Sequence, residues 1–303
     1  MANTLGTLIG TEVVQEVLRS LLVQFPVISQ ITKDFSAQAT KYNQQLSTRV
    51  IVPTTAVEHN ATTGYSAVDR TSVDVNVTIN KQAEVTYAVT DREQSQTNRD
   101  LRNEFIATSA HALGTKILAD LFATVAAASY PLSYTSSAAN FDAADVRKIK
   151  TLLNKAGVLD LNRFGVINSD FAEGLGLDNI IVANPNGANP DFLASGMLPK
   201  IHNFLLSEYA SLPDNGEKLA GIFGTAESIV MASRLPDVAG DAAELPGVIS
   251  NVTEPNSGLS IQFRRYYDML AAKLSVSMTV MYGFGVGLSE AGLSKRLVRV
   301  VTP

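Results

Sequence analysis

The stretch Val73-Asp-Val-Asn-Val-Thr-Ile79 alternates strictly between apolar and polar residues, and so does Ala83-Glu-Val-Thr-Tyr-Ala-Val89 shortly after it. A period of two residues is that of a strand with one buried face. Asn80-Lys-Gln82 lies between them and is expected to turn the chain, so the two stretches predict a β-hairpin. Thr90-Asp-Arg-Glu93 follows with the spacing of a capping box, in which each of two side chains binds a backbone N–H at a helix start.

The helix that begins there is expected to be unusually long, because no proline follows before Pro131. About 35 residues at about 1.5 Å each give about 50 Å, whereas helices in globular domains average about 11–12 residues. Two adjacent apolar stripes indicate that it packs along one side; they consist of Leu101, Phe105, Leu113, Ile117 and Leu121, and of Ile106, Ala110, Leu118 and Phe122. A strut of this kind is typical of a building block rather than of a catalyst.

The sequence before the hairpin predicts a helix and a further strand. Residues 1–10 are expected to be flexible, and residues 11–24 have the apolar spacing of an amphipathic helix that stops before a proline. Residues 49–52 are prone to form a strand. Residues 54–71 are rich in Thr, Ala, Ser and Asn without helical period, so we expect them to be the tip of a long two-stranded loop. We interpret this loop as a projecting, partner-binding arm, because long loops in compact domains are usually functional.

Downstream of the long helix the pattern changes. Residues 130–140 are rich in Ser and Ala and mark a boundary. The elements expected after it are helices at 142–156 and 170–175, strands at 163–168, 200–206 and 219–223, and a short element at 225–231. Three more strands are expected at 259–263, 276–282 and 297–301. The chain is therefore predicted to be α+β, with an α/β region inserted between the long helix and the C-terminal strands.

Composition limits the class of protein. At 303 residues the chain can form one or two domains with a substantial core. Charged residues make up 17%, below the usual value of about 25%, and no run of 18 apolar residues could cross a bilayer. The apolar excess fits either a surface covered by neighbouring subunits or a large monomer core. No signal peptide is expected, and the absence of cysteine fits cytosolic synthesis and excludes disulfides and thiolate sites.

Charge is unevenly distributed along the chain. Residues 160–254 carry 13 acidic and 4 basic side chains, residues 255–303 carry 6 basic and 2 acidic ones, and residues 1–159 are neutral overall. A tight or sequence-specific nucleic-acid binder should have a concentrated basic face, which this pattern does not predict. The sequence still allows weak, sequence-independent contact with nucleic acid through scattered basic groups such as Arg264 and Arg265.

The sequence predicts no catalytic, cofactor-binding or metal site. The histidines lie on the loop tip, the long helix and a strand, without a second ligand at metal spacing; they are His59, His111 and His202. No helix with a Walker-type lysine follows Gly283-Phe-Gly-Val-Gly287, so we interpret its glycines as relief of crowding in a bent strand. Acidic pairs such as Asp241 and Glu244 are expected to be solvated. Because a Gly-x-Ser-x-Gly elbow is also absent, an α/β metabolic enzyme is disfavoured.

The order of hairpin, long helix, α/β insertion and returning strands resembles that of tailed-bacteriophage major capsid proteins, which have the HK-97-type fold shared with encapsulin shells. Residues 73–95 are similar to the family's hairpin and spine-helix junction. Three further stretches are similar to its A-domain and closing strands: Gly196-Met-Leu-Pro-Lys-Ile-His-Asn-Phe-Leu-Leu-Ser207 with Leu212-Pro213, Lys218-Leu-Ala-Gly-Ile-Phe-Gly-Thr-Ala-Glu-Ser-Ile-Val-Met-Ala232, and Met281-Tyr-Gly-Phe-Gly-Val-Gly287 with residues 297–301.

The resemblance covers nearly the whole chain and implies a role for each part. Residues 1–45 would be an N-terminal arm, 46–90 the extended β-hairpin loop that overlaps a neighbouring subunit, and 91–139 the spine helix and peripheral domain. Residues 140–254 would form the axial domain around capsomer axes, and 255–303 would complete the peripheral domain.

The resemblance also implies a function. The chain would self-assemble through pentamers and hexamers into an icosahedral shell that encloses the double-stranded DNA of a tailed phage, in the virion, after synthesis in the cytoplasm of a bacterial host. Implied partners are further copies, a separate scaffolding protein, a portal, a decoration protein and DNA by weak non-specific contact, with no membrane and no cofactor. The alternatives are an encapsulin-type compartment around a cargo enzyme, and a tail-tube or decoration protein, which is usually shorter and richer in β-structure.

Overall fold

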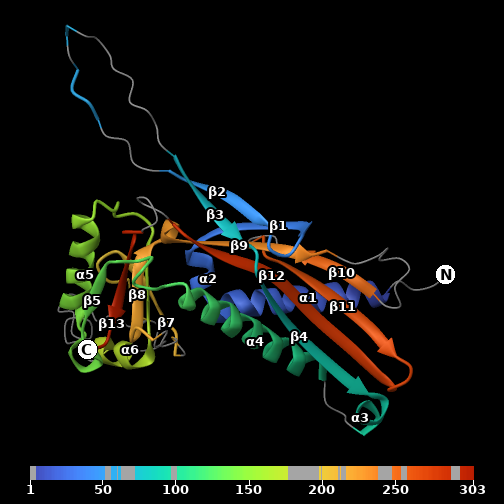
Figure 1. The fold of residues 1–303 in the computed structure, drawn as a ribbon. Helices are drawn as coiled ribbons and strands as arrows, with labels where there is room; N and C mark the ends of the chain where they lie inside the picture. The colour runs from blue at the N-terminus through green and yellow to red at the C-terminus, as the bar shows by residue number, and fades with distance from the viewer. Residues whose placement is uncertain are drawn as a thin grey trace.

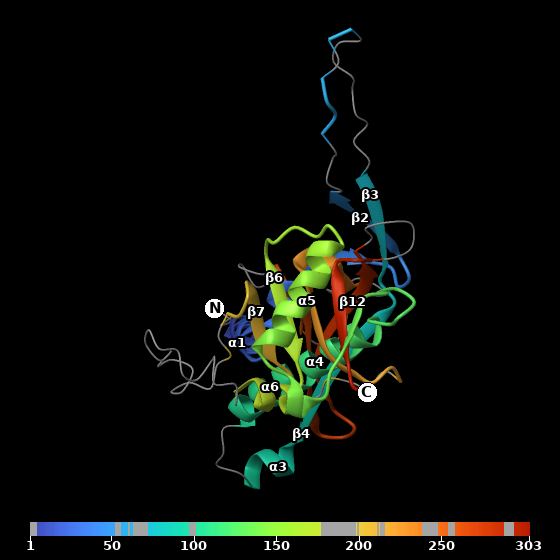
Figure 2. The same cartoon turned by 90° about the vertical axis from the view of Figure 1, so that its left-hand side faces the viewer.

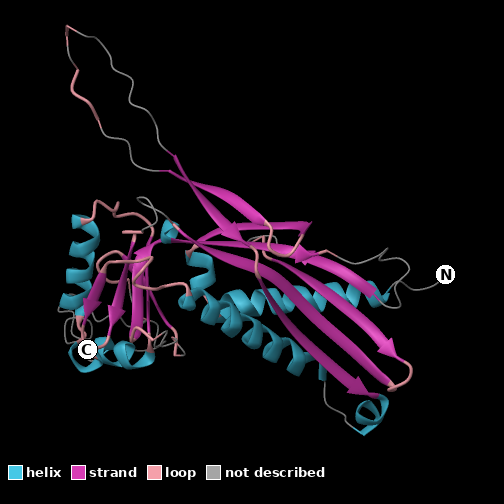
Figure 3. Cartoon of the chain, viewed as in Figure 1, coloured by secondary structure: helices cyan, strands magenta, loops and turns pink. Residues whose placement is uncertain are grey.

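Two β-sheets of different size, each covered by helices, make up most of the computed structural model (Figure 1 and Figure 3). The structure describes residues 5–51, 56–59, 61–62, 72–96, 101–176, 198, 200–210, 212, 216–237, 248–253, 258–287 and 294–303. A separate two-stranded hairpin projects from the larger sheet (Figure 1). Helices and strands both contribute, so the α+β class expected from the sequence is confirmed.

The larger sheet has six strands that come from distant parts of the chain. Its order is β1 (Thr32–Thr40), β9 (Ile229–Pro236), β12 (Lys273–Val286), β11 (Ser260–Asp268) and β10 (Val248–Thr253), with β4 (Lys81–Thr90) paired to β12. Only the β1–β9 pair is parallel among these described strands. β12 bonds to β4, β11 and β9, so it is the central strand of this sheet.

Helices α1 (Leu5–Gln24) and α4 (Leu101–Ala123) lie side by side against one face of this sheet (Figure 1). Their apolar stripes and the sheet share the main core, whose members include Leu18, Leu21, Leu113, Ile117, Met278 and Val280. The short helix α2 (Val27–Gln30) follows α1. Phe25 lies so close to α4 that a Cβ on Gly114 would be 2.1 Å from its ring. A glycine is therefore required at position 114 of α4, because the Phe25 ring, just after α1, packs directly against it.

The smaller sheet has five strands. Their order is β5 (Ser133–Thr135), β13 (Leu297–Val301), β8 (Leu219–Thr225), β6 (Arg163–Ile167) and β7 (Phe204–Glu208). It packs against α5 (Ala143–Lys155) and α6 (Ser169–Gly176) over a second core that includes Phe141, Phe171, Phe204 and Phe223. Two 3₁₀ turns, η1 (Ala138–Asn140) and η2 (Ala226–Ser228), complete the connections. α5 begins and ends as the sequence predicts, with the Asp142 side chain accepting a backbone N–H at 2.9 Å and Gly157 at a φ of 77°.

The predicted pairing of the two alternating stretches is wrong, although both stretches are strands. β3 (Ser72–Thr78) pairs with β2 (Gln45–Ile51), whereas β4 pairs with β12. Alternation reports which face of a strand is buried and does not identify the strand beside it. The β2–β3 pair confirms the two-stranded part of the expected long loop, whereas most of its expected tip, residues 54–71, lies outside the described residues.

The predicted single helix of about 35 residues is wrong in its length. The capping box is present, because Glu93 Oε2 accepts the Thr90 N–H at 2.9 Å and the Glu93 N–H donates to Thr90 Oγ1 at 3.2 Å. However, it starts only the six-residue helix α3 (Asp91–Gln96). α4 is a separate element of 23 residues, about 34 Å long, and residues 97–100 lie outside the described part. Figure 1 shows α3 beyond the end of β4, out of line with α4.

The strands are grouped in the sheets differently from the sequence expectation. β9 and β10 belong to the larger sheet although they fall within 140–254, and β13 belongs to the smaller sheet although it falls within 255–303. The sequence also does not predict β1 or β10. α1 begins at Leu5 rather than at residue 11, so the expectation that residues 5–10 are flexible is wrong; residues 1–4 lie outside the described part. The roles that the resemblance gives to the ranges 1–45, 46–90, 91–139, 140–254 and 255–303 stay predictions.

Candidate assembly surfaces

The β2–β3 hairpin projects from the larger sheet (Figure 1). Its strands pair from Gln45 opposite Thr78 to Ile51 opposite Ser72. Backbone hydrogen bonds close its base, where the Ile79 N–H donates to the carbonyl of residue 44 at 3.0 Å. Beyond β2, residues 56–59 and 61–62 are exposed and lie far from the sheets (Figure 1 and Figure 2). The described residues beyond β2 are therefore accessible to a partner molecule.

Close packing anchors the base of the hairpin on the larger sheet. A small buried cluster joins β3 to β9 and consists of Val75, Val77, Val230 and Ala232. β3 also crosses β12, where a Cβ on Gly283 would lie 2.1 Å from the carbonyl oxygen of Thr78. The glycines of residues 283–287 therefore relieve crowding, as predicted. At Gly283 and Gly285 the crowding comes from β3, which lies across β12, and at Gly287 it comes from the backbone of Glu227.

The turn between β11 and β12 is a second exposed surface, beside α3 (Figure 1). Met269 and Leu270 there are 89% and 101% exposed. The Asp268 carboxylate accepts two backbone N–H groups of the turn, at 3.0 and 3.2 Å. The Tyr267 hydroxyl donates to the Asp91 carboxylate of α3, and this hydrogen bond raises the pKa of Tyr267. A turn of fixed shape with apolar side chains in water is typical of an interaction site.

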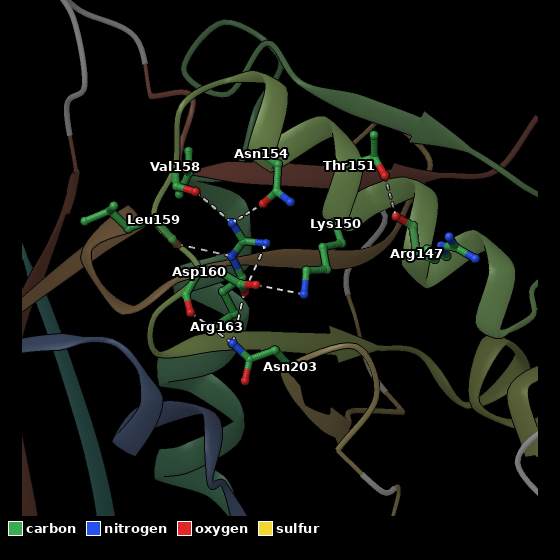
Figure 4. A network of polar contacts seen from close by, with 9 residues as sticks. All are labelled: Arg147, Lys150, Thr151, Asn154, Val158, Leu159, Asp160, Arg163 and Asn203. Atoms are coloured by element: carbon green, nitrogen blue, oxygen red, sulfur yellow. Dashed lines mark hydrogen bonds and ion pairs between the residues drawn. The ribbon is translucent and has the colours of Figure 1, made fainter.

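A buried arginine supports the third surface, the loop between α5 and β6 (Figure 4). Arg163 Nη2 donates to the Val158 carbonyl and to the Asn154 amide oxygen, both at 2.7 Å, and Nε donates to the Leu159 carbonyl at 3.3 Å. Nη1 lies 3.4 Å from Asp160 Oδ1, an ion-pair distance without hydrogen-bond geometry. Burial lowers the pKa of Arg163, and the Asp160 charge opposes this effect.

Asp160 connects the same loop to two other elements. Its backbone oxygen and Oδ1 each accept Asn203 Nδ2 at 3.0 Å, and its Oδ2 lies 2.7 Å from Lys150 Nζ of α5. The bonds to Asn203 and Lys150 lower the pKa of Asp160, so the carboxylate stays ionised and the contacts persist at neutral pH. The flanking Leu159 and Leu161 are 60% and 66% exposed.

Comparison with known proteins places this architecture among virus structures. No family model matches the sequence, and no curated protein is detectably similar to it. The capsid of cyanophage P-SCSP1u matches with a TM-score of 0.58 and 10% identity, over 90% of this chain and 86% of that chain. The mature capsid of bacteriophage PhiM1 (TM-score 0.55, 11% identity, 89% and 85% covered) and the capsid of Ralstonia phage GP4 (0.55, 12%, 89% and 86%) are similarly close.

The chain has the fold of phage capsid proteins. At 10–12% identity this likeness concerns the fold alone. Because the match spans about nine-tenths of the chain, this capsid fold takes in both sheets and is not confined to one of them.

Within this capsid fold the three histidines stay apart. His59 is exposed beyond β2, and His111 lies on α4 with its ring centroid 5.7 Å from that of Phe25. His202 lies in a turn at a φ of 46°, so its predicted place in a strand is wrong. Among the described residues no three His, Asp or Glu side chains gather where they could hold a metal ion. The acidic pair at 241 and 244 falls outside the described residues.

Arg264 and Arg265, the basic residues suggested for contact with DNA, do not form one continuous basic surface. Arg264 and Arg265 are neighbours on β11, so their side chains point to opposite faces of the sheet. Both are half-buried, and Arg264 Nε and Nη2 donate to Gln262 Oε1 at 2.9 and 2.7 Å. None of the described helices is both long and apolar enough to cross a membrane.

Sequence reasoning missed two of these three surfaces, at residues 158–161 and 268–272. Their only signal in the sequence is that apolar residues adjoin turn-forming ones, as in Leu159-Asp-Leu161 and Asp268-Met-Leu270. The same signal occurs at the ends of ordinary buried strands, so the sequence alone does not single these loops out.

Proposed function

We propose that the chain is a major capsid protein that self-assembles through pentamers and hexamers into an icosahedral shell around the double-stranded DNA of a tailed phage. The extent of the fold match carries this proposal, because phage capsid structures cover about nine-tenths of the chain in one alignment. A shell of identical chains needs many modest contacts that symmetry repeats. The three exposed surfaces are suited to such contacts.

The ranges assigned from the sequence give two of the surfaces a role in this proposal. All of the β2–β3 hairpin except Gln45 falls within 46–90 and would overlap a neighbouring subunit, and the smaller sheet carries the part proposed to surround capsomer axes. Separate scaffolding, portal and decoration proteins are proposed as partners in the virion. Contact with DNA would be weak and non-specific, in keeping with a net charge of −5 and the scattered basic groups.

An encapsulin-type compartment is the second candidate, because it would use the same fold around a cargo enzyme. It is less well supported, since the structural neighbours reported above are phage capsids. An enzymatic role has less support still, because the structural neighbours are capsids.

Electron microscopy and light scattering of the purified, overexpressed protein test this proposal. We expect closed shells, or rings of five and six subunits. A uniform monomer or dimer that persists in the presence of a candidate scaffolding protein would overturn it. Nucleic acid recovered from nuclease-treated particles made during infection would support the phage assignment, and a co-purifying enzyme in its place would support the compartment.

A further inference from the structure

The bonds around Arg163 hold an apolar loop in one shape. The guanidinium donates to two carbonyls and one amide oxygen and lies at ion-pair distance from one carboxylate, and all but Asn154 among these partners belong to the loop itself. A buried guanidinium is unfavourable unless its donors are bonded. The loop and the arginine therefore depend on each other, and the loop has little freedom to fold its side chains inward.

This shape leaves leucines in water. Leu159 and Leu161 are 60% and 66% exposed, and Leu205 on the edge strand β7 is 49% exposed. Figure 4 shows the Leu159 side chain pointing away from the polar network. Asn203, two residues before Leu205, joins β7 to the loop through Asp160. A preorganised apolar surface loses little entropy on binding, so it is well suited to dock another molecule.

The two ends of the smaller sheet carry opposite charges. β6 and β7 are parallel, so the loop lies where both strands begin, together with the exposed Lys155 and Lys200. α6 follows β6 at the opposite end, where Asp170, Glu173 and, at the end of β7, Glu208 are exposed. Among the described residues, three charges of the other sign near these ends are bonded within the chain: Asp160 with Lys150, Glu227 with Arg296, and Lys218 with the carbonyl of Pro303.

We propose that the loop end of the smaller sheet, defined by Lys155, Leu159 and Leu161, docks on the α6 end, defined by Asp170 and Glu173, of a second copy of this chain. The charge complementarity of the two ends identifies the occupant, because every copy carries one basic apolar end and one acidic end. Repeating such a head-to-tail contact closes a ring. This inference rests on the proposed shell and names one contact within it.

Cysteine cross-linking tests the contact directly, because the chain has no cysteine of its own. The double variant Leu161→Cys, Glu173→Cys is assembled, oxidised or treated with a short thiol-reactive linker, and run on a non-reducing gel. We expect a ladder that ends at five or six subunits. Ala144→Cys replaces Leu161→Cys in the matched control, because Ala144 is also exposed but lies near the start of α5; this control should give no ladder.

The other outcomes of the cross-linking experiment overturn either the contact or the proposed function. Dimers formed by Leu161→Cys alone would show that two loop ends meet and would overturn the head-to-tail contact. Shells that give no ladder, or an equal ladder in the control, would overturn the contact and leave the proposed function standing. Failure of the wild-type chain to form any particle, even with a candidate scaffolding protein present, would overturn the proposed function itself, and the contact with it.

Charge exchange gives a second readout that does not depend on cross-linking. Lys155→Glu and Glu173→Lys should each lower the yield of particles about tenfold, because like charges then face each other. The combined variant should recover the yield to within about twofold of wild type, since it restores opposite charges. Unchanged yields in the single variants, or no recovery in the combined one, would contradict the contact. All these side chains are exposed, so melting temperatures should stay unchanged and confirm folding.

Discussion

Replacing Gly283 by alanine should detach the β2–β3 hairpin from the larger sheet. The new Cβ would lie 2.1 Å from the Thr78 carbonyl oxygen, 2.8 Å from its carbon and 3.2 Å from the Ile79 Cα. All three are backbone atoms, so no change of rotamer relieves the clash. β3 would have to move by about 1.3 Å for the closest pair to reach an ordinary contact of 3.4 Å.

The cost of this change follows from the packing at the base of the hairpin. If β3 stays in place, overpacking destabilises it by about 1–3 kcal/mol. If β3 moves away, Val75 and Val77 lose their contacts with β9, at about 1.5–3 kcal/mol for each fully buried side chain. We therefore expect the docked hairpin to lose about 3 kcal/mol, or about 100-fold in its docking equilibrium.

Hydrogen exchange measured by mass spectrometry on the unassembled subunit checks this prediction. An isolated two-stranded hairpin is marginally stable in water, so the amides of β2 and β3 should exchange about 100-fold faster, while those of β13 serve as an internal reference. Gly285→Ala is the comparison, because its nearest contacts under 3.4 Å would be the Val77 and Val75 methyls at 2.7 and 3.1 Å rather than backbone atoms, so it should cost less than Gly283→Ala, about 1 kcal/mol. Wild-type exchange of β2 and β3 in Gly283→Ala would refute the reasoning.

Asp120→Asn should destabilise the subunit by about 1–3 kcal/mol at neutral pH, because this α4 carboxylate accepts the Tyr282 hydroxyl at 2.7 Å and lies 3.0 Å from Lys81 Nζ. Burial acts to raise the pKa of Asp120, but the bonds from Tyr282, Lys81 and Lys116 together lower it. The stability that the Asp120 carboxylate contributes is therefore fully present above the unfolded pKa of about 3.9. It is lost as the pH falls through the lower pKa of the folded state. Urea unfolding of variant and wild type should converge below about pH 4, and a constant difference down to pH 2 would contradict this. Thr90→Ala should speed amide exchange in α3 about fivefold, because the cap contributes about 1 kcal/mol, and unchanged exchange would show that the cap is not needed. Deleting residues 54–71 should leave a soluble subunit that cannot close shells, so normal particles seen by electron microscopy would refute the proposed role of the hairpin.

Local chemistry made much of the secondary structure predictable. The alternation in β3 and β4, the Thr90 and Glu93 cap and both ends of α5 depend on residues near one another in the sequence, and the structure contains all of them. The overlong helix followed from using the absence of proline as evidence for a helix. Gln94-Ser-Gln-Thr-Asn-Arg-Asp100 offers no apolar face to bury, and tertiary packing of such a face supplies most helical stability.

Strand partners were less predictable, because they depend on contacts between distant residues. β1 lies beside β9 about 200 residues away, and nothing in the polar stretch Thr32–Thr40 identifies that partner. The loop surface at Arg163 was missed for a related reason. Its arginine sits in an otherwise apolar strand, and the carbonyls that bind it carry no side-chain signature in the sequence.

The central position of β12 determines when the subunit can fold during synthesis. Until residue 286 has left the ribosome, β4, β9 and β11 have no common neighbour, and until residue 301 follows, β5 and β8 have none either. Both cores therefore close only after translation of β13, through contacts of long sequence separation that form slowly. A chain terminated before β12 would have neither sheet complete, so it would be a target for proteolysis and would not enter a growing shell as a defective part.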